Sequence, residues 1–312
     1  MVLPCSGGAI FDLLIVKREF IMRIRPTTIT NFAKMATSSI YQRKEDETAN
    51  SEIYDQIAAG YDNDYGRIFK RVKHEIEIQL SQLPLVSPSI IDVGTGTGEN
   101  ILLAENIFGS LNKVYGIDIS HKMLEIAKEK YPPMQIVQAS ALTMSNFIHH
   151  KADVVFIHFL LSYVSIDKLL PLVSGLLKPE GYISVASSLL SSWPKGQRLG
   201  IPLGLSPSSA KHYIPKSSQE LRSKLTDFGF KEIDSVEIRK RMIFDSINEG
   251  YRFGFEQGWI YQLFELLDCA GNPKKFAKDW GHIIPYDDEI HIHIGLYKKS
   301  KTRKGREELL HL

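Results

Sequence analysis

The stretch IIDVGTGTGEN, residues 90–100, decides the fold of this chain. Branched aliphatic residues lead into Asp92, and glycines then occupy positions 94, 96 and 98. Glycine costs backbone entropy and weakens regular structure, so three alternating glycines indicate a turn that something approaches closely. We therefore expect a buried strand over Ser89–Val93, the glycine turn, and a helix over Glu99–Phe108.

Strand-like and helix-like segments alternate on both sides of this turn. Two segments upstream, near residues 50–62 and 66–83, have helical spacing of their apolar residues. Strands that alternate with helices pair in parallel through right-handed crossovers, which predicts a doubly wound α/β sheet. The further elements that we expect are strands over Lys113–Ile117, Met134–Val137, Ala152–Ile157 and Gly181–Ala186, and helices over His121–Lys130 and Ile166–Leu177.

The second half of the chain is less regular. The sequence predicts a long loop over residues 190–215, which are rich in glycine, proline and serine. A helix near residues 217–227 and strands over 231–241 and 289–299 follow. Residues 242–285 are rich in aromatics, and we expect a helical cap there.

Bulk composition narrows the function classes. The 312 residues carry a net charge of +2, so nothing favours a nucleic-acid partner. The two cysteines, Cys5 and Cys269, lie at opposite ends of the chain and make no disulfide framework. We find no stretch that could span a bilayer, and we expect a cytoplasmic protein.

The spacing of the three glycines separates two classes of ligand. Gly94, Gly96 and Gly98 follow G-x-G-x-G, whereas the dinucleotide fingerprint is G-x-G-x-x-G. The third fingerprint position holds Glu99, whose charge would repel a pyrophosphate at the start of a helix. A cationic ligand would not be repelled.

This turn resembles motif I of the class I S-adenosylmethionine-dependent methyltransferases, and the resemblance runs from about Ser51 to Lys298. It is closest to the small-molecule branch, of the methyltransferase type 11/12 kind. The resemblance implies a Rossmann-like, seven-stranded, mostly parallel sheet with a helical cap inserted before the last strand. It divides the chain into an N-terminal extension (1–45) expected to be poorly ordered, the methyltransferase domain (46–299, with the cap at 242–285), and a basic flexible tail (300–312).

The resemblance also implies S-adenosylmethionine as cofactor and assigns its contacts. Asp118, 20 residues after Gly98, would hold the ribose hydroxyls. Ser140 stands where the family often has an acid that meets the adenine amino group, which is a departure. Tyr61 would close over the cofactor. The full set of expected cofactor contacts is Tyr61, Asp92, Gly94, Thr95, Gly96, Gly98, Asp118, Ile119, Ser140, Ala141 and His158.

Catalytic candidates follow from the need for a base. An imidazole titrates near neutral pH, so His158, just past the fourth strand, is the best candidate. Tyr163 and His212 are weaker candidates. His291 and His293 lie at i and i+2, but two ligands without a third make a weak metal signal, and we expect no metal.

The expected function is methyl transfer to an oxygen, nitrogen or carbon atom of a small molecule, with an apolar or aromatic substrate walled by the cap. We expect neither a nucleic acid nor a membrane as partner. Two alternatives stay open: a regulatory protein that binds S-adenosylmethionine without methyl transfer, and an NAD-type oxidoreductase.

Overall fold

The computed structural model describes residues 47–195, 213–259, 269–281 and 284–300. The predictions for residues 1–45, for His212 and for most of the tail lie outside this part. The helices before the glycine turn are α4 (Glu47–Ile57), the 3-10 helix η1 (Ala58–Asn63) and α5 (Phe69–Leu80). The elements after it are β1 (Ile90–Val93), α6 (Glu99–Phe108), β2 (Val114–Asp118), α7 (His121–Lys130), β3 (Gln135–Gln138), η2 (Met144–Asn146), β4 (Ala152–His158), α8 (Ile166–Leu176), β5 (Leu177–Ser188), α10 (Ser218–Asp227), β6 (Phe230–Phe244), α11 (Ile247–Tyr251), the π-helical turn η4 (Arg252–Glu256), α13 (Pro273–Trp280) and β7 (Tyr286–Lys299).

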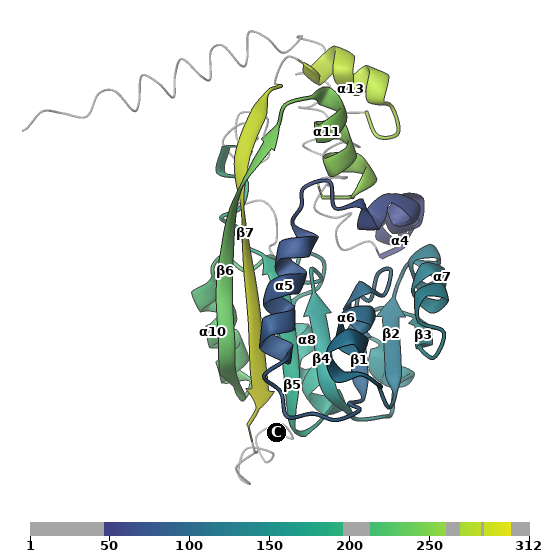
Figure 1. Cartoon of the computed structure of the whole chain (residues 1–312), viewed down its shortest axis with the longest axis vertical. Coiled ribbons are helices and arrows are strands. Elements are labelled where there is room, and N and C mark those ends of the chain that lie inside the picture. The colour runs from purple at the N-terminus through teal and green to yellow at the C-terminus, as the bar shows by residue number, and fades with distance from the viewer. Residues whose placement is uncertain (1–46, 196–212, 260–268, 282–283, 301–312) are drawn as a thin grey trace, which may run out of the picture.

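The strands form one seven-stranded sheet in the order β3-β2-β1-β4-β5-β7-β6 (Figure 1). The five strands from β3 to β5 pair in parallel, and β7 runs antiparallel to both β5 and β6. The predicted doubly wound, mostly parallel sheet is confirmed. The order reverses at β1, so the carboxyl ends of β1, β2 and β4 lie at the switch point where α/β sheets bind ligands.

Both faces of the sheet are buried, which explains the continuous apolar runs in its central strands. Ile90 and Phe156 face a core that α5, α6 and α7 complete. Ile91 and Val155 face a second core on the opposite side, completed by α8 and α10. Two covered faces hold β1 rigidly, so the glycine turn that follows it starts from a fixed point.

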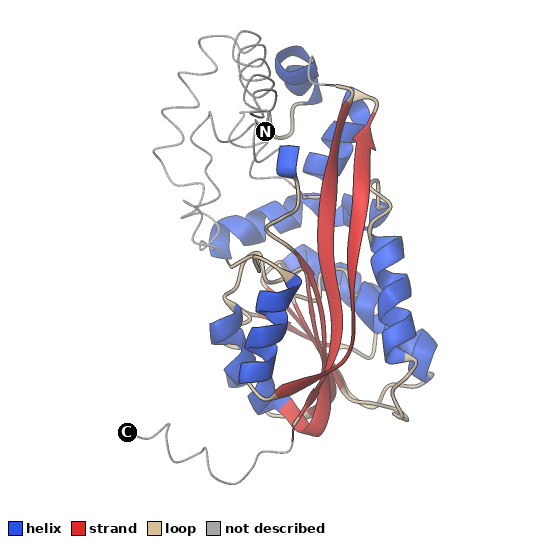
Figure 2. Cartoon of the chain, turned by 90° about the vertical axis from the view of Figure 1, so that its left-hand side faces the viewer, coloured by secondary structure: helices blue, strands red, loops and turns tan. Residues whose placement is uncertain are grey.

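The last two strands are longer than the sequence predicts. The β6–β7 register continues to the pair Phe244–Tyr286, so Met242, Ile243 and Phe244 are strand rather than cap. Met242 and Phe244 are buried against the α5 side of the core, which extends the ribbon past the other strands. Figure 2 shows β6 and β7 rising together beyond the rest of the sheet.

The described part of the cap is helical, as predicted. It consists of α11, η4 and α13, and the rings of Tyr251 and Phe276 join α11 to α13 with centroids 5.8 Å apart. No helix in the described part of the chain is long and apolar enough to cross a membrane.

Candidate functional site

A cavity of about 310 Å³ lies at the carboxyl ends of β1, β2 and β4. Helix α4 passes above these strand ends (Figure 1), and residues of α4 and η1 form part of the cavity wall. We call it the cofactor cavity. Of the predicted cofactor residues, it is lined by Tyr61, Gly94, Gly96, Asp118, Ile119, Ala141 and His158.

The three glycines of the turn have different roles. All adopt a positive φ, at 74° for Gly94, 53° for Gly96 and 82° for Gly98. Gly94 and Gly96 line the cavity, as expected if a ligand approaches their backbone. Gly98 does not line this cavity, and a Cβ there would lie 3.1 Å from Ala127 on α7. Its missing side chain serves the packing of the turn against α7.

Asp118 ends β2 and faces the cofactor cavity. Its Oδ2 accepts from the Gly96 N–H at 2.9 Å, and its Oδ1 accepts from the Ser120 N–H at 2.9 Å. Burial raises the pKa of Asp118, and the backbone donors oppose that rise. The cap of helix α7 is Ser120, whose hydroxyl accepts from the Met123 N–H.

Asp92 lies beneath the glycine turn rather than in a cavity. It is fully buried, and its Oδ2 accepts from the Thr95 hydroxyl at 2.9 Å. The Asn100 amide donates to both of its carboxylate oxygens at 3.3 Å. Burial raises the pKa of Asp92 to about 7. Asp92 and Thr95 therefore stabilise the glycine turn through their buried hydrogen bond.

His158 ends β4 in a place that does not suit a general base. Its Nδ1 lies 2.9 Å from Asn100 Oδ1, and its Nε2 lies 3.0 Å from Ser184 Oγ. The side chain is 7% exposed, and burial lowers the pKa of the imidazole to about 3. A base of that strength is poorly matched to neutral pH. This geometry favours a positioning role over the proton acceptor that the sequence suggested.

Tyrosines close the other side of the cavity. The Tyr54 hydroxyl donates to the Tyr163 hydroxyl at 2.8 Å, and both rings line the cavity. The ring of Tyr61 lies edge-on to Tyr54, with centroids 6.1 Å apart. Burial raises the pKa values of Tyr54 and Tyr61, so both stay protonated.

Ser140 follows β3 but does not line the cavity itself. Its hydroxyl donates to Glu47 Oε1 at 2.5 Å, and Glu47 lines the cavity from α4. Glu47, Tyr54 and Leu142 are lining residues that sequence reasoning missed. Only the helical spacing of residues 50–62 pointed toward α4, and nothing in that spacing marks which side chains meet the strand ends.

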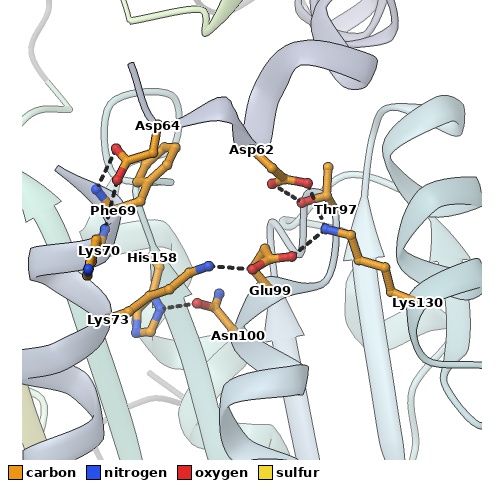
Figure 3. A network of polar contacts seen from close by, with 10 residues as sticks. All are labelled: Asp62, Asp64, Phe69, Lys70, Lys73, Thr97, Glu99, Asn100, Lys130 and His158. Carbon is orange, nitrogen blue, oxygen red and sulfur yellow. Dashed lines mark hydrogen bonds and ion pairs between the residues drawn. The ribbon is translucent and has the colours of Figure 1, made fainter. Parts of the chain in front are cut away.

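Glu99 lies on the far side of the turn, in the wall of a second, adjoining cavity of about 750 Å³. Its carboxylate pairs with Lys73 of α5 and Lys130 of α7, and Lys130 also pairs with Asp62 (Figure 3). Burial raises the pKa of Glu99, but Lys130 and Lys73 outweigh it and leave this pKa below its usual value. Glu99 pairs with two lysines and does not line the cofactor cavity. It therefore does not select a cationic ligand there, which differs from the expectation drawn from the sequence.

Aromatic rings line the junction of the two cavities with the cap. Phe159, which lines both cavities, packs against Phe69 of α5 and Trp259 with ring centroids 5.7 and 5.5 Å away. The stacked pair Trp259–Phe253 continues this wall into the cap, with centroids 5.6 Å apart.

The two histidines of β7 lie apart from this site. His291 contacts Ser191 and Glu289, whereas His293 contacts Tyr297. Within the described ranges, no group of three or more histidine, cysteine or acidic side chains could hold a metal ion.

Comparison with known proteins agrees with this geometry. Residues 91–185 match the family described as "Methyltransferase domain". The chain is 28% identical over 145 residues to an uncharacterised protein of Methanocaldococcus jannaschii, covering 46% of this chain and 53% of the relative. It is 29% identical over 122 residues to the demethylmenaquinone methyltransferase of Chlorobaculum tepidum, covering 36% of this chain and 48% of that one. The chain thus spans about half the length of these curated relatives.

Solved structures share the fold. The E. coli protein YjhP aligns with a TM-score of 0.53 at 15% identity, over 78% of this chain and 98% of that one. A Bacillus halodurans protein aligns with a TM-score of 0.51 at 15% identity, over 72% and 98% of the two chains. The fold is the Rossmann-like, mostly parallel, seven-stranded fold that the sequence resemblance predicted. Over residues 91–185 the chain is similar to methyltransferase domains.

Proposed function

We propose that this protein transfers a methyl group from S-adenosylmethionine to a small molecule. The observation that carries the proposal is the place of Asp118, which lies in a cavity at the switch point of the sheet beside the backbone of Gly94 and Gly96. An ionised carboxylate has about four acceptor positions. The N–H groups of Gly96, Ser120 and Ile119 use about three of them, which leaves capacity for at least one ribose hydroxyl.

The rest of the cavity fits the same cofactor. Ile119, Ala139, Ala141 and Leu142 give an apolar wall beside Asp118, which suits the faces of a purine. A volume of about 310 Å³ is at the small end of the roughly 300–1,000 Å³ of ligand pockets, and the adjoining cavity enlarges the space. The two cavities share Tyr61, Gly94, Gly96, His158 and Phe159.

The bound cofactor would supply an electrophilic methyl group, and the residues of the chain would supply binding and orientation. Holding the acceptor in line with that methyl can contribute roughly 7–11 kcal/mol of the barrier. The rings of Phe69 and Phe159, which line the cavities and pack against Trp259, support an acceptor with an apolar or aromatic body. His158 would hold Asn100, and through it the turn, rather than take a proton.

Titration calorimetry tests the cofactor. We expect S-adenosylmethionine and S-adenosylhomocysteine to bind the wild type, NADH not to bind, and Asp118→Asn to weaken both adenosyl ligands at least tenfold. Glu52→Gln, on the exposed side of α4, is the control that should bind as the wild type does. Binding of NADH alone would favour an oxidoreductase and end the proposal.

A binding protein without methyl transfer is the second candidate function. It is favoured by the buried, doubly hydrogen-bonded state of His158, which leaves the described part of the site without the imidazole base that the sequence suggested. Turnover measured over a panel of small hydroxyl, amine and thiol acceptors separates the two functions. Formation of S-adenosylhomocysteine that depends on an acceptor would establish the enzyme.

A further inference from the structure

The carboxylate of Glu47 and the hydroxyl of Ser140 meet at the edge of the cofactor cavity. Ser140 Oγ donates to Glu47 Oε1 at 2.5 Å and accepts from the Leu142 N–H at 3.1 Å. The Ser140 hydroxyl therefore uses its proton in the hydrogen bond to Glu47, and its oxygen accepts from the backbone of the loop after β3. Glu47 lines the cavity, whereas Ser140 does not.

The surrounding wall points to the ligand group that would meet this carboxylate. Glu47 meets Ser140, which lies in the chain between the wall residues Ala139 and Ala141, just after the strand β3 that pairs with the end of β2. If Asp118 holds the ribose, a purine lies against this wall with its edge toward α4. An ionised carboxylate can only accept hydrogen bonds, so it suits an amino group on that edge.

Helix α4 is fixed to the domain at several points, so Glu47 is held in place. Ser51 Oγ donates to the Ile119 carbonyl at 3.0 Å. Asp55 Oδ1 accepts from the Ser120 hydroxyl at 2.5 Å and from the Lys122 N–H at 3.0 Å. The Tyr54–Tyr163 hydrogen bond ties the next turn of α4 to the opposite wall of the cavity.

We propose that Glu47, oriented by Ser140, accepts a hydrogen bond from the exocyclic amino group of the cofactor's adenine. The inference rests on the proposed function. It assigns to helix α4 a contact that the sequence had placed at Ser140. Recognition of the base then requires α4 to be seated over the cavity, so cofactor binding and the position of α4 are coupled.

The test compares S-adenosylhomocysteine with S-inosylhomocysteine, which has a carbonyl oxygen in place of the amino group. Calorimetry on the full chain gives the ratio of the two affinities for each variant. Hydrogen bonds to charged groups correspond to a discrimination of about ten- to a hundredfold, and we expect the wild type to prefer the adenosyl ligand in that range. Glu47→Gln can accept from the amino group or donate to the carbonyl, so it should bring the ratio to within about threefold.

Two further variants keep the test specific. Ser140→Ala should reduce the ratio less than Glu47→Gln does, because the carboxylate remains but loses its orienting hydroxyl. Glu52→Gln lies on the same helix with an exposed side chain and should keep the wild-type ratio. Thermal unfolding of each variant checks that α4 and the domain remain folded.

Two results would overturn the inference in different ways. If Glu47→Gln weakens both ligands equally and preserves the ratio, Glu47 supports the structure and does not read the base. If the wild type binds neither ligand, the proposed function fails, and the assignment of Glu47 fails with it.

Discussion

His158 Nδ1 and Asn100 Oδ1 lie 2.9 Å apart, and this contact links the end of β4 to the helix that follows the glycine turn. The amide nitrogen of Asn100 faces Asp92 at the same time. Since that nitrogen is a donor, the amide oxygen faces His158, and the imidazole must donate from Nδ1. The Ser184 hydroxyl then donates to Nε2.

The first prediction concerns the protonation of His158. We expect a neutral imidazole with the proton on Nδ1, because both ring nitrogens are engaged and burial lowers the pKa to about 3. ¹⁵N spectra of histidine-labelled protein between pH 5 and 8 report the tautomer directly. A signal of the Nε2–H tautomer, or titration near pH 6.5, would show that the Asn100 amide faces the other way or that the ring is exposed.

The depressed pKa of His158 also predicts a dependence of stability on pH. Between the unfolded value of 6.5 and the folded value of about 3, the unfolded chain binds a proton that the folded one does not. The free energy of unfolding should therefore fall as the pH is lowered from 6.5, by on the order of 1 kcal/mol per unit. Urea titrations at pH 7 and 5 measure this change. The free energy of unfolding should fall less between the two values in His158→Gln than in the wild type.

Asp92 should give the opposite dependence. Burial raises the folded pKa from 3.8 to about 7, so the folded state binds the extra proton in that range. The contribution of Asp92 to stability is present at low pH and is lost as the pH rises toward 7, at a rate on the order of 1.4 kcal/mol per pH unit at most.

Urea titrations of Asp92→Asn at pH 5 and 8 measure this contribution. We expect the free energy of unfolding of the variant to rise relative to that of the wild type from pH 5 to pH 8. A pH-independent effect of the substitution on stability does not change this difference. Asp227→Asn, at the exposed end of α10, is the control and should follow the wild type. Parallel curves for Asp92→Asn and the wild type would mean that Asp92 is already ionised at pH 5.

Local patterns made the central fold predictable. From Ser89 to Ala186 the apolar runs, glycines and prolines mark each strand and helix, and the observed bounds differ by a few residues. The carboxyl ends of parallel strands meet at one edge, so the sequence alone is enough to place Asp118 beside the glycine turn. The length of β6 and β7 is not predictable in this way, because it depends on cross-strand register between residues such as Phe244 and Tyr286.

The chemistry of single site residues was less predictable, because distant partners set it. Ser140 and Glu47 are 93 residues apart, and no periodicity connects them. His158 is an ordinary candidate base by sequence, but Ser184 and Asn100 occupy both of its nitrogens. Sequence therefore predicted the strand ends at which these residues lie, while their protonation and pairing depend on the packed structure.

The ion pairs around Glu99 make a fourth prediction. Lys73, Lys130, Glu99 and Asp62 connect α5, α7, α6 and η1 across the outer side of the turn (Figure 3). The groups are about one-quarter to one-third exposed, and such pairs contribute roughly 1 kcal/mol or less. We expect Lys130→Gln to lower the free energy of unfolding by about that amount at low salt. The loss should be smaller in about 0.5 M salt, because that concentration screens exposed charges.

Urea titrations in a double-mutant cycle with Glu99→Gln isolate the pair. Lys122→Gln, on the exposed side of the same helix, is the matched control and should show no coupling to Glu99. Equal salt dependence for Lys130→Gln and the control would contradict a contribution from this network.

The last prediction separates a glycine that packs from a glycine that meets a ligand. Gly98 and Gly229 have nearly the same φ, 82° and 83°, but a Cβ would meet Ala127 at 3.1 Å in the first case and nothing within 4 Å in the second. Gly229→Ala should therefore cost only the left-handed backbone strain, roughly 1–2 kcal/mol. Gly98→Ala should cost that amount plus about 1–3 kcal/mol of overpacking.

Urea titrations give both values, and Ala127→Gly in the Gly98→Ala background should recover part of the extra loss, as a positive coupling in a double-mutant cycle. Because Gly98 lines neither cavity, the folded fraction of Gly98→Ala should bind S-adenosylhomocysteine with an affinity within about threefold of the wild type, about 0.7 kcal/mol. Equal destabilisation at the two glycines would rule out the contact with Ala127 as the reason for glycine at this position. A large loss of affinity without loss of stability would return Gly98 to the ligand site.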